Sequence, residues 1–258
     1  MIIRWITGML FFTVAILVIW WGALPWGLFL GFLLILAALE WRRLGNLTDH
    51  TLPISLFVSW LLIVVSFNQG FYLSFLPLIL IFPAVSVLAR QNPETSRNLI
   101  WTAAGMIWLS LPAAILYMTR LEFGWRILTL LLVATVAEDT LALYGGKFFG
   151  GERTFAPGIS PNKTWAGSIG AVLGATVVIV VGGHYLEWPF HLSLSLGLLL
   201  GVFGQLGDLI ISALKRNSGL DDTGRLFPGH GGILDRVDGL ILNVCVFYPF
   251  CYWMVQST

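Results

Sequence analysis

The sequence predicts an all-α, polytopic integral membrane protein with about nine transmembrane helices. Hydrophobic residues make up 57% of the 258 positions, charged residues only 10%, and the mean hydropathy is +0.86. Soluble domains carry about 25% charged residues, so this composition excludes an ordinary soluble fold. In addition, apolar runs that approach the length of a span, about 20 residues, recur along the whole chain.

These apolar runs, separated by polar breaks, give nine predicted spans. They cover residues 5–21, 27–41, 54–67, 71–89, 98–119, 125–144, 165–183, 192–215 and 235–255. The run after Arg4 also resembles a signal peptide, but Trp20 and Trp21 make a poor cleavage context and a second apolar run follows at once. We therefore expect a retained first helix. Further tryptophans at span ends, typical of interfacial belts, are Trp26, Trp41, Trp125 and Trp188.

Lysine and arginine are distributed unequally between the two sides of this nine-span arrangement. One side carries Arg4, Arg42, Arg43, Arg90, Arg97, Lys147, Arg153, Lys163, Lys215, Arg216, Arg225 and Arg236. The other side carries only Arg120 and Arg126. Because basic residues concentrate on the cytoplasmic side of membrane proteins, we expect a cytoplasmic N-terminus and an outside C-terminus. The long polar loops 145–164 and 216–234 then lie on the cytoplasmic face, as in a bacterial-type inner membrane.

Charge, cysteine spacing and the lack of linkers exclude further classes of protein. The net charge of +1 and the lack of a basic cluster interleaved with aromatics argue against nucleic-acid binding. Cys245 and Cys251 have no metal-ligand spacing and are expected to be buried apolar residues. No linker breaks the chain, so we expect one membrane domain over 1–258, with 1–89 as an N-terminal group of helices and 98–258 as the functional part.

The scarce charges gather near the C-terminus. Of 14 basic and 13 acidic side chains, eight lie between Lys215 and Asp238. Within the eighth span, Gln205, Asp208, Ser212 and Lys215 are spaced by three, four and three residues and share one helical face. A lone carboxylate near mid-bilayer costs about 2.5–3.5 kcal/mol. The stripe therefore predicts a functional polar face; a structural Asp208–Lys215 pair, which needs a two-turn reach, is the alternative.

Further carboxylates flank the ninth span. Asp235 and Asp238 open it on one face, and Asp222 lies in the loop before it. They could complement the helix dipole, but clustered carboxylates repel each other unless a cation lies among them. With oxygen ligands and no His/Cys shell, Mg²⁺ is the expected ion, and a second, monovalent cation is an open candidate. The predicted metal ligands are Asp208, Asp222, Asp235 and Asp238.

Two loops predict a phosphate-bearing ligand. His230 is flanked by glycines, and the backbone N–H groups of Gly231 and Gly232 could approach an anion closely. Lys163 and Thr164 come just before the seventh span, where a helix N-terminus could help them bind a phosphate. An ordinary helix cap with a cytoplasmic lysine is the alternative. The predicted substrate-binding residues are Ser160, Lys163, Thr164, Ser212, Arg216, His230, Gly231, Gly232 and Arg236.

A second acidic pair, Glu138 and Asp139, lies near the end of the sixth span. Neighbouring side chains on a helix point about 100° apart. We therefore expect only one of the two to face the site, and add Asp139 as a further metal candidate.

These motifs resemble those of the phosphatidate cytidylyltransferases, also called CDP-diacylglycerol synthases. The resemblance to the family signature runs from Ser212-Ala-Leu-Lys-Arg, through Asp222 and Pro228-Gly-His-Gly-Gly, to Asp235-Arg-Val-Asp238. Ser160-Pro-Asn-Lys-Thr-Trp-Ala-Gly167 is similar to a second motif, and Glu138-Asp-Thr-Leu-Ala-Leu-Tyr144 with Gly150 to a third. Together they cover the C-terminal half of the chain.

The resemblance implies a dimeric inner-membrane enzyme that converts CTP and phosphatidate to CDP-diacylglycerol and pyrophosphate with Mg²⁺. It implies metal or phosphate roles for Asp208, Asp235 and Asp238, and phosphate binding by Lys163, Lys215 and Arg236. The expected catalytic residues are Asp208, Lys215, Asp235 and Asp238.

The sequence also departs from the family pattern at four positions near the expected site. Ala166 and Ile211 stand where glutamate is usual, Asp221 where lysine is usual, and Asn217 where aspartate is common. Each departure trades or removes a charge, so a lipid phosphate other than phosphatidate is an alternative substrate for this chain.

Three other functions remain alternatives. The first is a related CTP-dependent enzyme acting on another lipid phosphate or alcohol, and the second is an inactive membrane paralogue. A secondary transporter is a third, but it predicts an inverted repeat with broken helices in both halves, whereas the charges here lie in one half.

Overall fold

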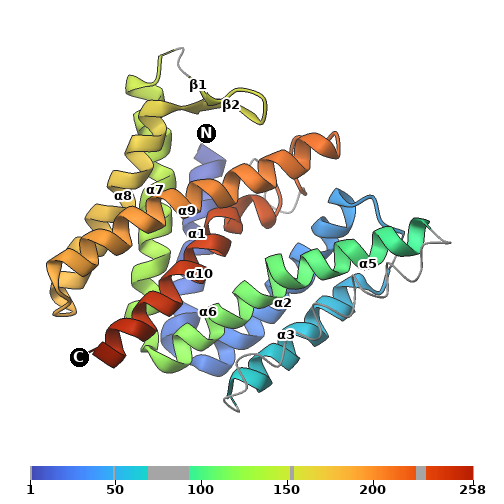
Figure 1. The fold of residues 1–258 in the computed structure, drawn as a ribbon, viewed down its shortest axis with the longest axis horizontal. Coiled ribbons are helices and arrows are strands. Elements are labelled where there is room, and N and C mark those ends of the chain that lie inside the picture. The colour runs from blue at the N-terminus through green and yellow to red at the C-terminus, as the bar shows by residue number, and fades with distance from the viewer. Residues whose placement is uncertain (1, 49, 69–92, 152–153, 225–230, 258) are drawn as a thin grey trace. The chain divides into compact units, whose positions relative to one another are not determined.

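The structure is a computed structural model that describes residues 2–48, 50–68, 93–151, 154–224 and 231–257 (Figure 1). Helices account for most of these residues. They are α1 (Ile2–Trp21), α2 (Ala23–Leu44), α3 (Leu52–Asn68), α5 (Pro93–Gly105), the π-helical turn η1 (Met106–Ser110), α6 (Leu111–Glu122), α7 (Gly124–Phe149), α8 (Trp165–Tyr185), α9 (Phe190–Asn217) and α10 (Leu234–Ser257). A short hairpin, β1 (Thr154–Ala156) and β2 (Ser160–Thr164), joins α7 to α8.

Every predicted span whose residues are described coincides with helix, but the predicted count of about nine is not confirmed. Among the described residues, six helical segments are long and apolar enough to cross a membrane. They are Ala23–Leu44, Pro93–Glu122, Gly124–Phe149, Trp165–Tyr185, Phe190–Asn217 and Leu234–Met254. Thr7–Trp21 and Leu52–Asn68 are apolar but shorter, and the predicted span 71–89 lies outside the described residues.

The hairpin corrects the all-α prediction within the polar loop 145–164. Its strands pair in antiparallel fashion, with Thr154 opposite Thr164 and Ala156 opposite Ser160. Pro157 and Gly158 form the turn between them, and the Ile159 N–H donates to the Ala156 carbonyl across it at 3.1 Å. Proline and glycine favour such turns because of their backbone conformations. The two strands bring the chain back toward the start of α8.

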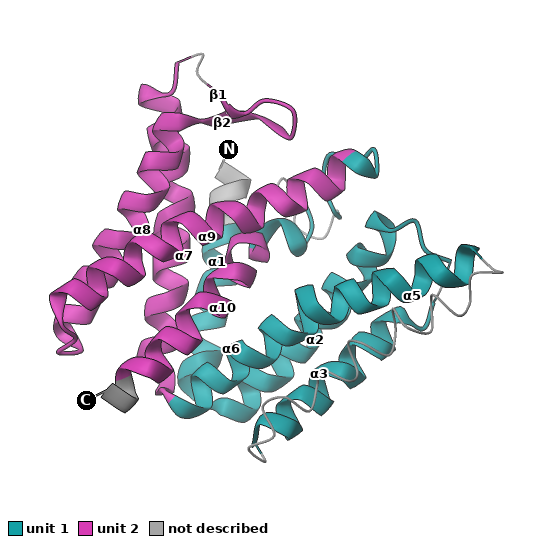
Figure 2. Ribbon diagram, in the orientation of Figure 1, with its two compact units in different colours: residues 1–122, 217–236 teal, residues 123–216, 237–258 magenta. Residues whose placement is uncertain are grey.

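The chain divides into two compact units (Figure 2). Unit 1 comprises Met1–Glu122 and Asn217–Arg236, and unit 2 comprises Phe123–Arg216 and Val237–Thr258. The first division therefore falls between α6 and α7, later than the end of the expected N-terminal group at residue 89. That the chain forms a single membrane domain stays a prediction.

Unit 1 has an apolar core in which tryptophans take part. Trp26 and Trp41 are each only 2% exposed, so they belong to this core and not to the predicted interfacial belt. Their indole N–H groups donate to the Leu116 carbonyl at 3.3 Å and the Trp101 carbonyl at 3.0 Å. These hydrogen bonds let a large indole be buried without an unsatisfied donor.

In unit 2, glycines let helix backbones approach each other closely. A Cβ at Gly170 on α8 would strike the Leu141 carbonyl of α7, and one at Gly201 on α9 would strike the Cα of Val172 on α8. Small residues at such contacts are typical of membrane helices, where close packing stabilises association. The α8 helix is thereby packed against both α7 and α9.

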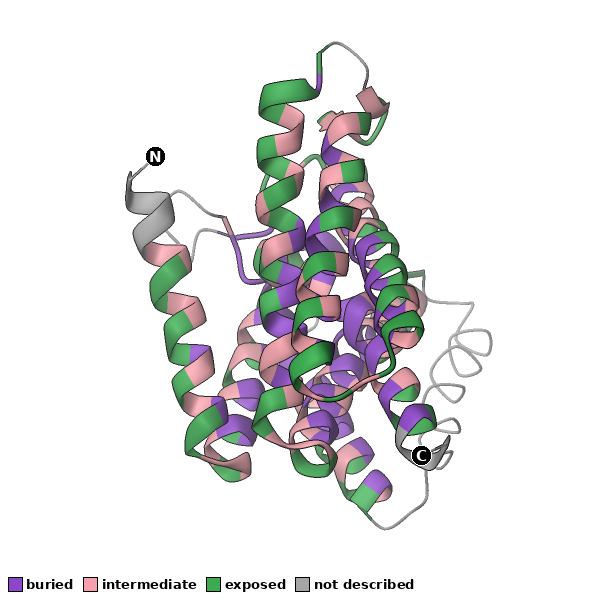
Figure 3. Cartoon of the chain, turned by 90° about the vertical axis from the view of Figure 1, so that its left-hand side faces the viewer, coloured by how far each residue is buried: buried purple, intermediate pink, exposed green. Residues whose placement is uncertain are grey.

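Exposed residues recur along the helices, as Figure 3 shows in green, and on α8 some of them form an apolar face. Leu173, Val177 and Val181 are each more than half exposed and repeat every four residues. A helix face of this kind is suited to contact with lipid, because apolar side chains have no polar groups that need hydrogen bonds from water.

The contact between α9 and α10 is equally close. A methyl group added at this contact should therefore destabilise the fold. A Cβ at Gly207 would strike the backbone oxygen of Asp238. We expect Gly207→Ala to lower the free energy of unfolding by about 1–3 kcal/mol through overpacking, measured by thermal denaturation in detergent. Gly158→Ala is the control, because no heavy atom lies within 4 Å of a Cβ there. Equal melting temperatures for both variants would contradict this packing.

Candidate active site

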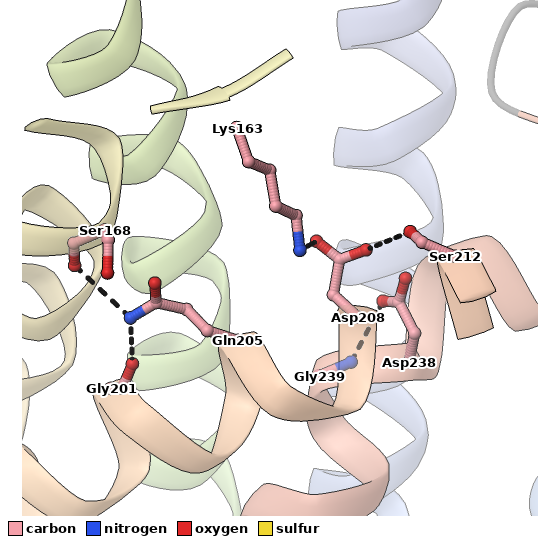
Figure 4. Close-up of polar contacts among 8 residues, drawn as sticks. All are labelled: Lys163, Ser168, Gly201, Gln205, Asp208, Ser212, Asp238 and Gly239. Atoms are coloured by element: carbon pink, nitrogen blue, oxygen red, sulfur yellow. Dashed lines mark hydrogen bonds and ion pairs between the residues drawn. The ribbon is translucent and has the colours of Figure 1, made fainter. Parts of the chain in front are cut away.

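The polar face predicted for the eighth span is present on α9, and Asp208 is its centre (Figure 4). The Lys163 ammonium lies 2.5 Å from Asp208 Oδ2, and the Ser212 hydroxyl donates to Asp208 Oδ1 at 3.2 Å. Ser212 is one helical turn from Asp208, as the spacing predicted. The counter-charge of Asp208 therefore comes from the hairpin, whereas the alternative from the sequence was Lys215 on the same helix.

The hairpin determines where Lys163 lies. Lys163 is the penultimate residue of β2, and the next residue, Thr164, is the N-cap of α8. The Thr164 hydroxyl accepts the Gly167 N–H at 3.1 Å. Thr164 is thus the ordinary helix cap that was the alternative to phosphate binding, while Lys163 enters the polar cluster. Ser160 lies at the other end of β2, opposite Ala156.

Asp238 reaches the same cluster from α10. Gly207, the neighbour of Asp208, abuts the Asp238 backbone. Figure 4 shows the Asp208 and Asp238 carboxylates close to each other. Asp238 Oδ1 accepts the N–H of Gly239 at 2.9 Å. The two predicted metal ligands of unit 2 therefore come together, although they are thirty positions apart in sequence.

A third carboxylate of unit 2 was missed as a site residue. Glu138 is 2% exposed and accepts the side-chain N–H of Asn243 at 2.9 Å. Its carboxylate contacts the position that a Cβ of Gly204 would occupy, and it lies within electrostatic range of both Asp208 and Asp238.

Of the two neighbours, Glu138 is therefore the one that faces this cluster, while Asp139 is exposed on α7. A metal role for Asp139 stays a prediction. Neighbouring side chains on a helix point about 100° apart, so the two acids face different directions. Glu138 faces Gly204 on α9, where the missing side chain leaves room for its carboxylate. The sequence held a signal for this outcome, since Asn243 is a polar residue inside the ninth span and could serve as a donor to a buried acid.

In unit 1, Asp235 is bound to its own loop. Its Oδ2 accepts three hydrogen bonds at 2.9 Å, from the N–H and hydroxyl of Thr223 and from the N–H of Gly232. The Gly232 N–H, predicted to bind an anionic ligand, is therefore used by a protein carboxylate. Gly231 has a φ of +79°, and a Cβ there would lie 2.6 Å from Asp235 Oδ2. Only glycine suits this position.

A further carboxylate in unit 1, Glu40, was also missed. It lies near the end of α2, is 6% exposed, and accepts the N–H groups of Ile233 and Leu234 at 2.9 and 3.0 Å. Its place within the second predicted span was the available signal, because acidic residues within spans usually serve a function.

The other predicted residues lie at the ends of these elements. Lys215 and Arg216 are in the last turn of α9, and Arg236 is exposed at the start of α10. Asp222 is exposed in the loop of unit 1, with its Oδ1 at 3.1 Å from the Cβ position of Gly231. His230 lies outside the described residues.

The departures from the family pattern differ in their surroundings. Ile211 is fully buried, so a glutamate there would need a partner inside the protein. Asn217 and Asp221 are exposed, and Ala166 is half-buried at the start of α8, next to Gly145 of α7. Three of the four positions can thus change charge without disturbing the core.

Similarity to known proteins extends over nearly the whole chain. The model of the cytidylyltransferase family matches residues 2–254. The chain belongs to this family. It is 33% identical over 261 residues to the phosphatidate cytidylyltransferase of Brucella abortus, an alignment that covers 96% of this chain and 92% of that protein.

Shorter alignments show higher identity. The phosphatidate cytidylyltransferase of Synechocystis sp. is 43% identical over 127 residues, which cover 48% of this chain and 43% of that protein. The chloroplastic phosphatidate cytidylyltransferase 4 of Arabidopsis thaliana is 45% identical over 117 residues, which cover 45% of this chain and 29% of that protein. Together with the six apolar helical segments, these relatives indicate a multi-pass membrane protein of this enzyme family.

Proposed function

We propose that this protein is a phosphatidate cytidylyltransferase that converts CTP and phosphatidate to CDP-diacylglycerol and pyrophosphate. The observation that carries the proposal is the polar cluster of unit 2, in which the Lys163–Asp208 ion pair lies beside Asp238 on a neighbouring helix. The family match over residues 2–254 and the names of the relatives support the same reaction.

The reaction needs no general base from the protein. A phosphate monoester has a second pKa of about 6, so the phosphate of phosphatidate is largely dianionic at neutral pH. Its oxygen forms a bond to the α-phosphorus of CTP, while the bond from that phosphorus to the bridging oxygen of the β-phosphate breaks. Pyrophosphate leaves with the bonding electron pair. The protein has to align these groups and stabilise their negative charge.

Asp208 and Asp238 are the residues that would hold Mg²⁺. Among the residues that the structure describes, no group of three or more His, Cys, Asp and Glu side chains could hold a metal ion by itself. Mg²⁺ typically takes only one or two carboxylates and completes its shell with water and substrate phosphates, so two carboxylates fit it. When bound, the ion would neutralise charge on the phosphates. A metal role for Asp222 and Asp235 of unit 1 stays a prediction.

Cationic side chains would stabilise the remaining charge. Lys163 is already directed to Asp208, and a triphosphate bound beside this carboxylate would come within reach of the same ammonium group. Ser212 orients Asp208 through its hydrogen bond. Lys215 and Arg216, at the end of the same helix, supply further positive charge.

The distribution of lysine and arginine supports a cytoplasmic location for loops 145–164 and 216–234, where CTP is available. With the N-terminus also cytoplasmic and the C-terminus outside, phosphatidate would enter from the bilayer and CTP from water. A homodimer remains our expectation for the assembly.

A labelled-substrate assay tests the proposed reaction. With purified protein, phosphatidate, Mg²⁺ and CTP labelled at the α-phosphate, we expect the label in a chloroform-soluble product, with one pyrophosphate released per lipid formed. Removal of divalent ions by EDTA should abolish the transfer, and added Mg²⁺ should restore it.

Other lipid phosphates and lipid alcohols in the same assay distinguish the related reactions. Release of CDP in place of pyrophosphate would identify a lipid kinase. No labelled lipid from any of these acceptors would contradict an active transferase, and labelled lipid only from another phosphate would assign a different substrate.

A further inference from the structure

The loop that leads into α10 is attached to α2 through one buried carboxylate. Glu40 Oε1 accepts the N–H of Ile233, while Oε2 accepts the N–H of Leu234 and the hydroxyl of Thr223, at 2.9, 3.0 and 2.7 Å. The two amides belong to the start of α10, where helix N–H groups have no partner within the helix. The negative charge of Glu40 also suits the positive end of the helix dipole.

The surrounding glycines fit this carboxylate closely. A Cβ at Gly224 would strike Glu40 Oε1, and a Cβ at Gly232 would strike Oε2. Both glycines are buried. The loop therefore encloses the carboxylate on both sides, and a larger residue at either position would displace it.

Thr223 connects Glu40 with Asp235. Its hydroxyl lies within hydrogen-bonding distance of Glu40 Oε2, at 2.7 Å, and of Asp235 Oδ2, at 2.9 Å. A hydroxyl has only one proton to donate, so the two carboxylates share this donor. The Thr223 N–H donates to Asp235 as well, at 2.9 Å. Glu40, Thr223 and Asp235 thus form one hydrogen-bonded group that joins Thr223 to Asp235 and to the start of α10.

We propose that Glu40 is a positioning residue for the reaction: it holds Thr223, the start of α10 and, through Thr223, Asp235 in the arrangement on which turnover depends. The inference rests on the proposed function, because Asp235 is one of the residues expected to take part in that reaction. Glu40 itself is buried, and it acts through the backbone of Ile233 and Leu234.

Kinetics of Glu40→Gln test this role. The amide keeps the size of the side chain but removes its charge, and one of its two polar atoms can no longer accept an N–H. We expect kcat, measured per folded protein, to fall at least about tenfold. KM for CTP should change much less, which is the pattern expected when an interaction made only in the transition state is lost. Glu40→Asp, which keeps the charge, should retain more activity than Glu40→Gln.

Two further variants keep the test decisive if Glu40→Gln folds poorly. Gly224→Ala leaves the charge in place but pushes a methyl group against Glu40 Oε1, so it should lower kcat in the same way. Glu94→Gln is the matched control: Glu94 is an exposed carboxylate of unit 1 that accepts a hydrogen bond from Thr48, and its loss should leave kcat unchanged.

A spin label gives a readout that does not depend on activity. The label is attached at the exposed position 221 as Asp221→Cys, with Cys245 and Cys251 replaced by alanine. Glu40→Gln should sharpen the nitroxide lines, because the loop gains motion. Wild-type kcat in Glu40→Gln would overturn the proposal, whether or not the lines sharpen. Sharpened lines in a protein whose parent transfers no cytidylyl group would show that Glu40 holds the loop, but they would refute the proposed function.

Discussion

Asp238→Asn should abolish cytidylyl transfer while the protein still inserts into the membrane and folds. Asparagine keeps the size of the side chain and an acceptor oxygen for the Gly239 N–H, but it removes the charge that a divalent ion requires. We expect kcat to fall at least about a hundredfold, as when other charge-stabilising groups are removed from active sites. Steady-state turnover of purified protein, with circular dichroism as the check on folding, measures this effect.

Glu187→Gln is the control for this experiment. Glu187 is an exposed carboxylate of unit 2 in the turn between α8 and α9. The Glu187→Gln variant therefore also loses one negative charge, but at the opposite end of α8 from Lys163. Its turnover should equal that of the wild type. An Asp238→Asn protein with more than about a tenth of wild-type kcat would rule out an essential metal ligand at this position.

Lys163→Met should have the second largest effect. The substitution removes the ammonium that lies 2.5 Å from Asp208 Oδ2, and it leaves a half-buried carboxylate without this counter-charge. Losing one partner of such a pair, together with a phosphate contact, should lower kcat/KM for CTP about a hundredfold. Lys163→Arg keeps the charge and should retain part of the activity, although the guanidinium has a different shape.

Lys147→Met is the matched control for Lys163→Met. Lys147 is exposed near the end of α7, where its ammonium lies 5.9 Å from the centre of the Phe148 ring. We expect kcat/KM for CTP to be unchanged. If Lys163→Met were as active as Lys147→Met, the Lys163–Asp208 pair would have no part in binding the triphosphate.

The polar cluster could be predicted in part from local spacing. Asp208 and Ser212 are one helical turn apart, so their contact follows from the helix alone. The partner of Asp208 could not be predicted in this way, because Lys163 reaches it through the β1–β2 hairpin. That hairpin lies in a loop for which composition predicted only polar character. Pairing between residues far apart in sequence depends on tertiary structure, which hydropathy does not report.

It was harder to predict which of two neighbouring acidic residues faces the interior. Helical geometry shows that Glu138 and Asp139 point in different directions, but it does not say which direction is the interior. That choice depends on Gly204 and Asn243, which belong to two other helices. Glu40 was missed for a related reason, since its partners lie 183 to 194 positions away in the chain.

Loop hydrogen bonds were the least predictable part of the site. The glycines before α10 were expected to offer their N–H groups to a ligand, but the Gly232 N–H donates to Asp235. Charge and glycine content do not distinguish a loop that binds an anion from a loop that binds its own carboxylate. By contrast, each predicted span whose residues are described is helical, because long apolar runs have few alternatives to helix in a bilayer, although only six of these segments are long and apolar enough to cross a membrane.

The central claim is that Asp208 of α9 and Asp238 of α10 together hold the divalent ion that binds the triphosphate. Diffraction from crystals grown with Mn²⁺ and CTP tests it most directly, because Mn²⁺ replaces Mg²⁺ and gives an anomalous signal. We expect an anomalous peak that contacts carboxylate oxygens of both Asp208 and Asp238 and a phosphate oxygen of CTP. A peak bound elsewhere, with these two carboxylates turned away from it, would contradict the claim.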